Sequence, residues 1–205
     1  MGQWNKFKFI SQGSQVMTDP KMLKIGDRAP AEFNVFVEIT AHASPIKYEL
    51  DTTTGILMVD RYLDPQQIFP IDYGFIPQTL AGDGKELDVM VLSPSPLMQG
   101  SMLACRALGC LMMEDEDGVD SKILAAPAYL ICSEYATIRS VHDVDGNLLR
   151  RLEEFFSTHK KSNFGRWSEV EGWRGKEEAD QQIAAAVSAF FTTGGGQKNG
   201  QVTQS

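Results

Sequence analysis

Hydrophobic and polar residues alternate over a series of short stretches in the first two thirds of the chain. Val35, Val37 and Ile39 share one face of the first stretch, and the same spacing returns over residues 46–50. A period of two residues predicts β-strands. Further apolar stretches predict strands over residues 56–61, 87–92, 103–113 and 123–126. Because tight turns separate strands of this length, the pattern suggests a closed antiparallel barrel.

Two of the connections have a recognisable form. Residues 51–55, Asp-Thr-Thr-Thr-Gly, predict a hairpin turn between the strands on either side. Residues 67–77 are rich in Pro, Gly and aromatic residues, and we interpret them as a loop followed by a short strand.

The last third of the chain has helical spacing instead. An apolar face predicts a helix over residues 147–160, with Asp145 as its N-cap. That face carries Leu148, Leu152, Phe155 and Phe156, with His159 in line. A second apolar face, which includes Ile183 and Val187, predicts a helix over residues 176–191. No element is assigned to the residues between the two helices.

The composition fits one folded domain with extensions at both ends. The chain has 205 residues, of which 42% are hydrophobic, and no apolar run approaches the roughly 18–20 residues of a membrane-spanning helix. We expect a flexible N-terminal extension over residues 1–21, a folded domain over residues 22–191 and a disordered tail over residues 192–205. We expect no membrane partner.

Charge and cysteine content narrow the function classes. The formal net charge of −8 argues against a nucleic-acid partner, because DNA and RNA phosphates would be repelled. Cys105, Cys110 and Cys132 form no C-x-x-C pair, and their odd number favours a reducing cytoplasm with thiols in the core. The phosphate-loop, dinucleotide, H-E-x-x-H and G-x-S-x-G motifs are all missing from the sequence.

Charged residues gather in three places along the chain. Each place has an ordinary explanation, because charged strand faces usually face solvent and acidic turns between strands are common. The first set, on the non-core faces of predicted strands, is Glu38, Lys47, Glu49 and Arg61. The second, in a glycine-marked turn, is Asp83, Glu86 and Asp88. The third is Asp115, Glu116, Asp117 and Asp120, followed by Lys122.

Taken together, the three sets suggest a metal and anion site. If the two acidic loops lie at the ends of neighbouring strands, their carboxylates would converge on a hard cation such as Mg²⁺. Lys47, Arg61 and Lys122 would then hold an anion such as phosphate. His159 alone is interpreted as a histidine packed at the edge of the core.

Several short motifs, in their order and spacing, resemble the soluble family I inorganic pyrophosphatases of the bacterial type. The resemblance runs from about residue 22 to residue 191. It is carried by Val37-Glu38-Ile39, Pro45-Ile46-Lys47-Tyr48-Glu49, Val59-Asp60-Arg61, Asp72-Tyr73-Gly74-Phe75-Ile76-Pro77, Leu87-Asp88-Val89, residues 115–122 and Val170-Glu171-Gly172-Trp173.

The resemblance implies an α+β, mainly β fold: a five-stranded closed OB-like barrel flanked by two C-terminal helices. It implies Mg²⁺-dependent hydrolysis of inorganic pyrophosphate to two phosphates by a cytoplasmic homohexamer. By position, the metal ligands would be Asp83, Asp88, Asp115 and Asp120, supported by Glu38, Glu49 and Glu116. The groups that bind pyrophosphate would be Lys47, Arg61, Tyr73, Lys122, His159 and Lys160.

The chain departs from the family pattern in the acidic turn. The family signature there is Asp-x-Asp-Pro-x-Asp, whereas this chain has Asp83-Gly84-Lys85-Glu86-Leu87-Asp88. Lys85 thus replaces an Asp that the resemblance links to activation of the attacking water, and Glu86 replaces a proline. Phe69 and His159 stand where tyrosines are usual.

Three interpretations of Lys85 remain open at the level of sequence. Glu86 takes over the role of the missing Asp, or Lys85 points to solvent and leaves a slower enzyme. Alternatively, the chain is a degenerate member that binds phosphate or a partner with little turnover. We favour an active enzyme whose catalytic residues are Lys85, Glu86 and Asp88, because the other metal and phosphate positions are intact. An OB-fold nucleic-acid binder is disfavoured by the charge.

Overall fold

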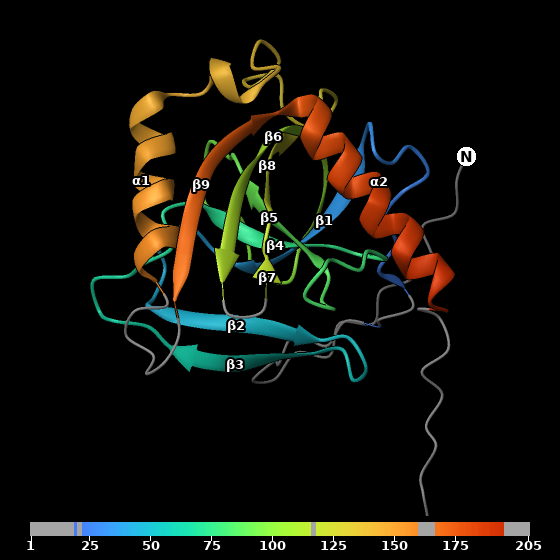
Figure 1. The fold of residues 1–205 in the computed structure, drawn as a ribbon, viewed down its shortest axis with the longest axis horizontal. Coiled ribbons are helices and arrows are strands. Elements are labelled where there is room, and N and C mark those ends of the chain that lie inside the picture. Colours follow the sequence, from blue (N-terminus) through green and yellow to red (C-terminus); the bar gives the residue numbers. More distant parts are fainter. Residues whose placement is uncertain (1–18, 20–21, 116–117, 160–166, 195–205) are drawn as a thin grey trace, which may run out of the picture.

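The computed structural model describes residues 19, 22–115, 118–159 and 167–194 (Figure 1). Most of the predicted extension over residues 1–21 and of the tail over residues 192–205 lies outside these ranges. The fold is mainly β, with two helices in the C-terminal third. Within the described part of the chain, no helix is both long and apolar enough to cross a membrane.

A seven-stranded sheet forms the centre of the molecule. Its strands are β1 (Phe33–Ile39), β4 (Asp72–Ile76), β5 (Leu87–Val91), β6 (Met102–Asp115), β7 (Gly118–Val119), β8 (Lys122–Pro127) and β9 (Ser168–Gly175). The order is β1-β4-β5-β8-β6-β7, β9 pairs with β6, and β6 pairs with β1 as well. The predicted strand positions are therefore confirmed to within a few residues.

One strand pair differs from the expected antiparallel arrangement. Strands β5 and β8 run parallel, with Val89 opposite Ile123 and Val91 opposite Ala125. A parallel pair needs a long connection between its strands. Here the connection contains β6, which pairs antiparallel with β8. The all-antiparallel prediction was wrong because local hydrophobic spacing does not reveal strand direction.

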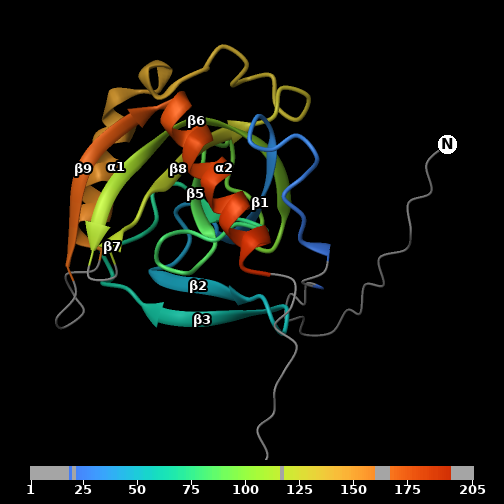
Figure 2. The same ribbon diagram turned by 45° about the vertical axis from the view of Figure 1, so that its right-hand side comes forward.

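Strands β2 (Ile46–Asp51) and β3 (Ile56–Tyr62) form a separate two-stranded sheet, which lies below the larger sheet in Figures 1 and 2. The turn between them is the predicted hairpin. Gly55 adopts a φ of 73° and its N–H donates to the Asp51 carbonyl at 2.7 Å. The Asp51 carboxylate accepts from the Thr53 N–H at 2.8 Å. This hairpin carries Lys47, Glu49 and Arg61 beside the larger sheet.

The two helices cover different parts of the core. Helix α1 (Gly146–Thr158) begins after Asp145, whose side chain accepts from the Asn147 N–H as the sequence predicts for an N-cap. Leu152, Phe155 and Phe156 of α1 pack into a cluster with Tyr73 and Leu111. Helix α2 (Lys176–Thr192) packs Ala179, Ile183 and Ala186 into a second cluster with Val35 and Val89. A short 3₁₀ turn over Val141–Asp143 precedes α1.

Strand β9 was not predicted, and its pairing shows why. It runs antiparallel to the second half of β6, where Met112 pairs with Gly172 and Met113 with Val170, so that Glu171 forms a bulge in β9. Next to this bulge, Gly172 has a φ of 116°, a conformation that favours glycine. Val170 and Trp173 both pack against the α1 cluster although they are an odd number of residues apart. The bulge therefore hides the period-two pattern in the sequence.

Two further features bear on the sequence expectations. Gly74 is required by close strand packing, because a Cβ there would lie 1.8 Å from the Phe36 carbonyl oxygen. Cys105 and Cys110 are buried free thiols, as expected, whereas Cys132 is only partly buried and does not belong to the core. Burial raises the pKa of the Cys110 thiol to about 11.

Candidate active site

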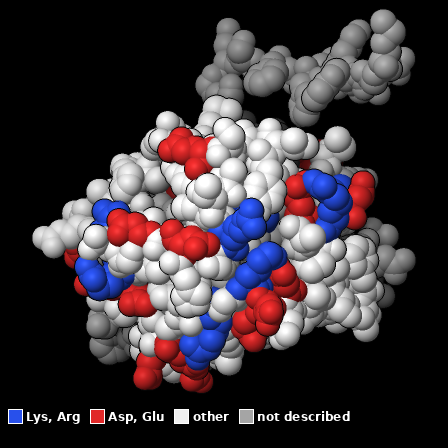
Figure 3. All heavy atoms as spheres, turned by 90° about the horizontal axis from the view of Figure 1, so that it is seen from above, with Lys and Arg blue, Asp and Glu red and all other residues white. Residues whose placement is uncertain are grey.

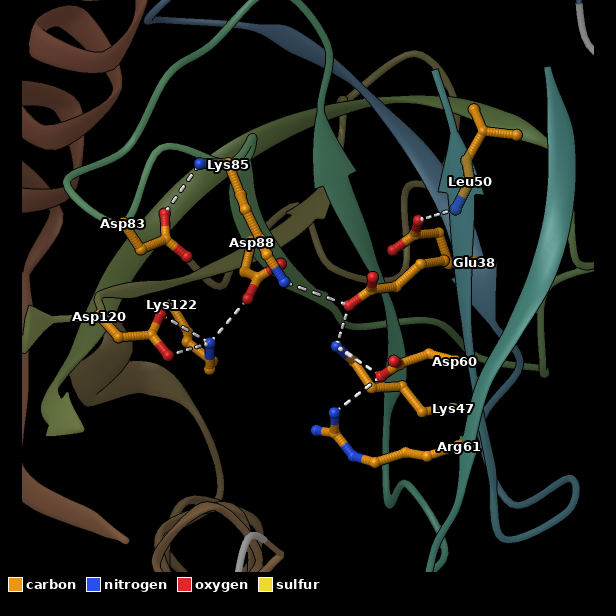
Figure 4. A network of polar contacts seen from close by, with 11 residues as sticks. Glu38, Lys47, Leu50, Asp60, Arg61, Asp83, Lys85, Asp88, Asp120 and Lys122 are labelled. Atoms are coloured by element: carbon orange, nitrogen blue, oxygen red, sulfur yellow. Dashed lines mark hydrogen bonds and ion pairs between the residues drawn. The ribbon is translucent and has the colours of Figure 1, made fainter. Parts of the chain in front are cut away.

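The fold brings charged side chains from five segments to one region between the large sheet and the β2–β3 hairpin (Figure 4). Glu38 comes from β1, the hairpin supplies Lys47 and Arg61, and Asp88 and Lys122 come from β5 and β8. Members of each of the three charged sets of the sequence, among them Lys47, Asp88 and Lys122, thus meet in space.

Lys122 joins the two acidic loops. Its Nζ lies 2.7 Å from Asp88 Oδ2, and 2.8 and 2.9 Å from the two carboxylate oxygens of Asp120. The parallel pairing of β5 and β8 places residue 88 next to residue 122. Only 3% of the Lys122 side chain is exposed, so this ion pair is shielded from solvent on the lysine side.

The charges in this group reinforce each other. Burial opposes the Lys122 ammonium, but the Asp88 and Asp120 carboxylates outweigh burial and hold the lysine pKa well above its ordinary value. Burial also opposes the Asp88 carboxylate, yet Lys122 and Lys47 together lower the pKa of Asp88. Asp88 and Lys122 are therefore both charged at neutral pH.

Tyr73 completes the Asp88 environment from β4. Burial, together with the Asp88 charge, raises the Tyr73 pKa well above its ordinary value, and the phenol is hydrogen-bonded to the Asp88 carboxylate. Its ring packs against Phe69 at 5.1 Å and Phe156 at 5.9 Å between ring centroids. Phe69, which replaces a usual tyrosine, therefore supports the Tyr73 ring from within the core.

The hairpin carries a second ion-pair group. Lys47 lies opposite Arg61 in the β2–β3 register. Lys47 Nζ contacts Glu49 and lies 3.5 Å from Asp60 Oδ2, while Arg61 Nη1 donates to the same Asp60 oxygen at 2.7 Å. Arg61 Nε is buried and has no hydrogen-bond partner, so the guanidinium retains an unused donor beside the site.

Asp60 is a site residue that the sequence reasoning did not select. It precedes Arg61 at the end of a predicted strand, where a charged pair normally faces solvent. Its carboxylate instead lies between Lys47 and Arg61. The only signal in the sequence was that Asp60 precedes Arg61. The pairing of β2 with β3 was needed to show that Asp60 also lies near Lys47.

Glu38 is a buried carboxyl at the edge of this region. It is 6% exposed, and its Oε1 accepts from the Leu50 N–H at 2.7 Å. Burial is the main reason why its pKa is raised to about 8, with the neighbouring Asp88 charge adding to the effect. At neutral pH, Glu38 therefore holds a proton that an exposed glutamate would have lost.

The acidic turn lies at the edge of this region. Gly84 adopts a φ of 81° there, and Asp83 Oδ1 accepts from the Lys85 N–H at 3.0 Å. The Lys85 side chain crosses toward β2, where its Nζ lies 3.6 Å from Glu49 Oε1. Glu86 is partly buried beside the turn. The turn thus holds Asp83 and Lys85 in the same region as Asp88.

The other predicted site residues have different surroundings. Asp115, at the end of β6, is 5% exposed. His159 is 5% exposed as well; its Nδ1 lies 2.9 Å from the Phe156 carbonyl oxygen and its ring stacks on Phe155. Glu116 and Lys160 lie outside the described residues. The predicted roles of these four residues stay predictions.

The donor set suits a hydrated Mg²⁺ ion. Asp83, Asp88 and Asp120 offer hard carboxylate oxygens within the same region (Figure 4). Over the residues whose positions are described, no His, Cys, Asp and Glu side chains form a group of three or more that would hold a metal ion. Mg²⁺ commonly binds through one or two carboxylates and keeps several waters, so these carboxylates fit that mode.

Comparisons with known proteins agree with this geometry. The sequence profile of the family described as inorganic pyrophosphatase matches residues 35–190. An inorganic pyrophosphatase of Ralstonia nicotianae is 44% identical over 165 residues, which span 80% of this chain and 94% of that protein. One from Xylella fastidiosa (strain 9a5c) is 39% identical over 173 residues, or 84% of this chain and 97% of that protein.

Solved structures give the same result. The inorganic pyrophosphatase of Thermus thermophilus superposes with a TM-score of 0.79 at 36% identity, over 85% of this chain and 99% of that one. That of Helicobacter pylori also gives 0.79, at 37% identity, over 83% of this chain and 99% of that one. The profile, the relatives and the fold agree, and the chain belongs to the inorganic pyrophosphatase family.

Proposed function

We propose that the chain hydrolyses inorganic pyrophosphate to two phosphates with Mg²⁺. The observation that carries the proposal is the gathering of Lys47, Arg61 and Lys122 with the Asp88 and Asp120 carboxylates in one region between the large sheet and the hairpin (Figure 4). Family membership supports the same reaction.

The basic side chains are suited to hold the substrate. Arg61 offers a planar fork to phosphate oxygens. Lys47 and Lys122 add compact charges on either side. Since Lys122 is held by two carboxylates, it keeps one position and a fixed positive charge while the substrate binds.

The carboxylates are suited to hold the metal. Asp83, Asp88, Asp115 and Asp120 are the proposed ligands, and Glu49 and Glu116 are proposed to support them. When bound, Mg²⁺ neutralises charge on the leaving phosphate and acidifies a water molecule. Tyr73 orients the Asp88 carboxylate through its hydrogen bond. Glu38 holds a proton at neutral pH next to Asp88, which places an acid beside the reacting groups.

The proposal also covers the barrel architecture, the absence of a nucleic-acid partner, the oligomeric state and the location of the protein. The pairings of β1 with β4, β4 with β5, β5 with β8, β8 with β6 and β6 with β1 support a closed five-stranded OB-like barrel. The mixed distribution of acidic and basic side chains on the face shown in Figure 3 supports the expectation of no nucleic-acid partner. The homohexamer and the cytoplasmic location rest on the resemblance alone.

Phosphate release from pyrophosphate is the test. With Mg²⁺, the purified chain is expected to release two phosphates per pyrophosphate, and excess EDTA is expected to stop the reaction. An absence of release with either Mg²⁺ or Mn²⁺ across the neutral and mildly alkaline range would refute the proposal. Calorimetry with pyrophosphate would then show whether the chain binds it without turnover, which is the degenerate alternative.

A further inference from the structure

The Lys85 side chain reaches a partner on another strand, although the residue is exposed and lies in a turn. Its backbone N–H is fixed by Asp83 Oδ1 at 3.0 Å, and its Nζ lies 3.6 Å from Glu49 Oε1 on another strand. Lys47 Nζ contacts the same Glu49 oxygen. In Figure 4 the Lys85 side chain spans the gap between the acidic turn and the hairpin group. The side chain is 65% exposed, so packing alone does not hold it there.

The charges around Lys85 explain this position. Its Nζ forms an ion pair with the Glu49 carboxylate of the hairpin, and its backbone N–H donates to the Asp83 carboxylate of the acidic turn. Asp88 lies in the same group of charges (Figure 4). A lysine ammonium is positively charged at neutral pH, and here it lies where carboxylates need a counter-charge.

The charge balance of the network depends on this residue. The contacts of the network join four basic residues to five acidic ones: Lys47, Arg61, Lys85 and Lys122 with Glu49, Asp60, Asp83, Asp88 and Asp120. An acidic residue at position 85 would change the net charge of the network by two units. A single Mg²⁺ ion carries the same charge.

We propose that the Lys85 ammonium is a built-in cation of this site, which takes the place of one divalent ion in neutralising the Glu49, Asp83 and Asp88 carboxylates. The inference rests on the proposed function, since it assigns a role within the same metal and pyrophosphate site. Lys85 acts here through charge and not as a metal ligand, because a protonated amine has no free electron pair for a metal. Before substrate arrives, the chain binds fewer divalent ions than the same site with an acidic residue at position 85.

Direct metal binding without substrate tests this inference. Mn²⁺ is titrated into the metal-free full-length chain by calorimetry, with bound and free Mn²⁺ counted by electron paramagnetic resonance. Lys85→Met keeps the approximate length of the side chain and removes its charge. We expect it to bind Mn²⁺ roughly tenfold more tightly, the effect of removing a unit charge about 6 Å from a divalent ion in a watery dielectric of about 80.

A second variant tests the stoichiometry. Lys85→Asp is expected to bind one more Mn²⁺ ion per chain than the wild type, because it adds a ligand and removes a repulsive charge. Lys24→Met is the matched control: Lys24 is exposed and lies outside the network, and we expect it to leave Mn²⁺ binding unchanged. Because Lys85 is exposed, both variants at this position are expected to fold, which their melting temperatures check.

The outcomes separate cleanly. If wild type, Lys85→Met and Lys85→Asp bind Mn²⁺ with equal affinity and number, or if none binds it, the inference is overturned. A gain at position 85 that Lys24→Met does not share supports it. The result is independent of catalysis: failure to hydrolyse pyrophosphate would refute the proposed function, while a gain in Mn²⁺ binding would still establish Lys85 as a built-in cation.

Discussion

The ion pairs of Lys122 allow the loss of unfolding free energy on mutating this lysine to be worked out from the structure. Lys122→Met removes an ammonium that is 3% exposed and lies 2.7 and 2.8 Å from oxygens of Asp88 and Asp120. The two carboxylates are then left close together without their cation. Breaking a buried ion pair by removing one partner costs about 3–5 kcal/mol. Because the Asp88 side chain is 33% exposed, we expect the lower end of that range.

The assay is urea unfolding of the metal-free chain, followed by circular dichroism and tryptophan fluorescence. A loss of about 3 kcal/mol corresponds to a fall of roughly 6–12 °C in melting temperature for a chain of this size. Lys176→Met is the matched control. Lys176 Nζ lies 2.6 Å from Asp180 Oδ2, but its side chain is 39% exposed, so the pair is worth at most about 1 kcal/mol.

Comparing Lys122→Met with Lys176→Met shows whether the buried ion pairs of Lys122 stabilise the chain more than an exposed pair does. The expected result is a loss for Lys122→Met that clearly exceeds the loss for Lys176→Met. Equal losses, or a Lys122→Met protein as stable as the wild type, would refute the claim that Lys122 holds the two acidic loops together.

Three further predictions follow from individual contacts. Since the pKa of Glu38 is about 8 in the folded chain and 4.5 unfolded, its stabilising effect is complete below about pH 4.5 and is lost as pH rises through 8. Urea titrations without metal should therefore show Glu38→Gln gaining stability over the wild type across that window, and a constant difference would contradict this. Gly74→Ala should destabilise by at least about 3 kcal/mol because its Cβ meets the Phe36 carbonyl, whereas Gly146→Ala, with open space around it, should be nearly neutral in the same titration. In steady-state kinetics, Arg61→Lys should raise KM for pyrophosphate roughly tenfold because the planar fork is lost; an unchanged KM would remove Arg61 from the substrate site.

Local patterns were sufficient for most elements of the fold. Alternation gave β1, β2 and β3, and the helical spacing gave α1 and α2 nearly to their ends. Each of these elements buries one face, and one-sided burial produces a periodic pattern of apolar residues along the chain. The bulge at Glu171 interrupts that pattern, which is why β9 was not predicted.

The candidate site depended on information that no local pattern contains. The convergence of the acidic loops was expected, but it is the parallel register of β5 and β8 that puts Lys122 beside Asp88. Likewise, Asp60 became a site residue only through its contact with Lys47 across the hairpin. Strand direction and cross-strand register are set by the whole chain, so the sequence could single out most of the charged residues that meet here, but not Asp60 and not the partner of each residue.

The most direct test of the account compares phosphate release from pyrophosphate by the wild type, Asp88→Asn and Asp180→Asn with saturating Mg²⁺. Asp180 pairs with Lys176 on α2, outside the site, and serves as the control. We expect the rate of Asp88→Asn to fall by about tenfold to a hundredfold, and the rate of Asp180→Asn to equal that of the wild type. Equal rates in all three proteins would contradict the account, because they would mean that the hydrolysis arises elsewhere or from a contaminating enzyme.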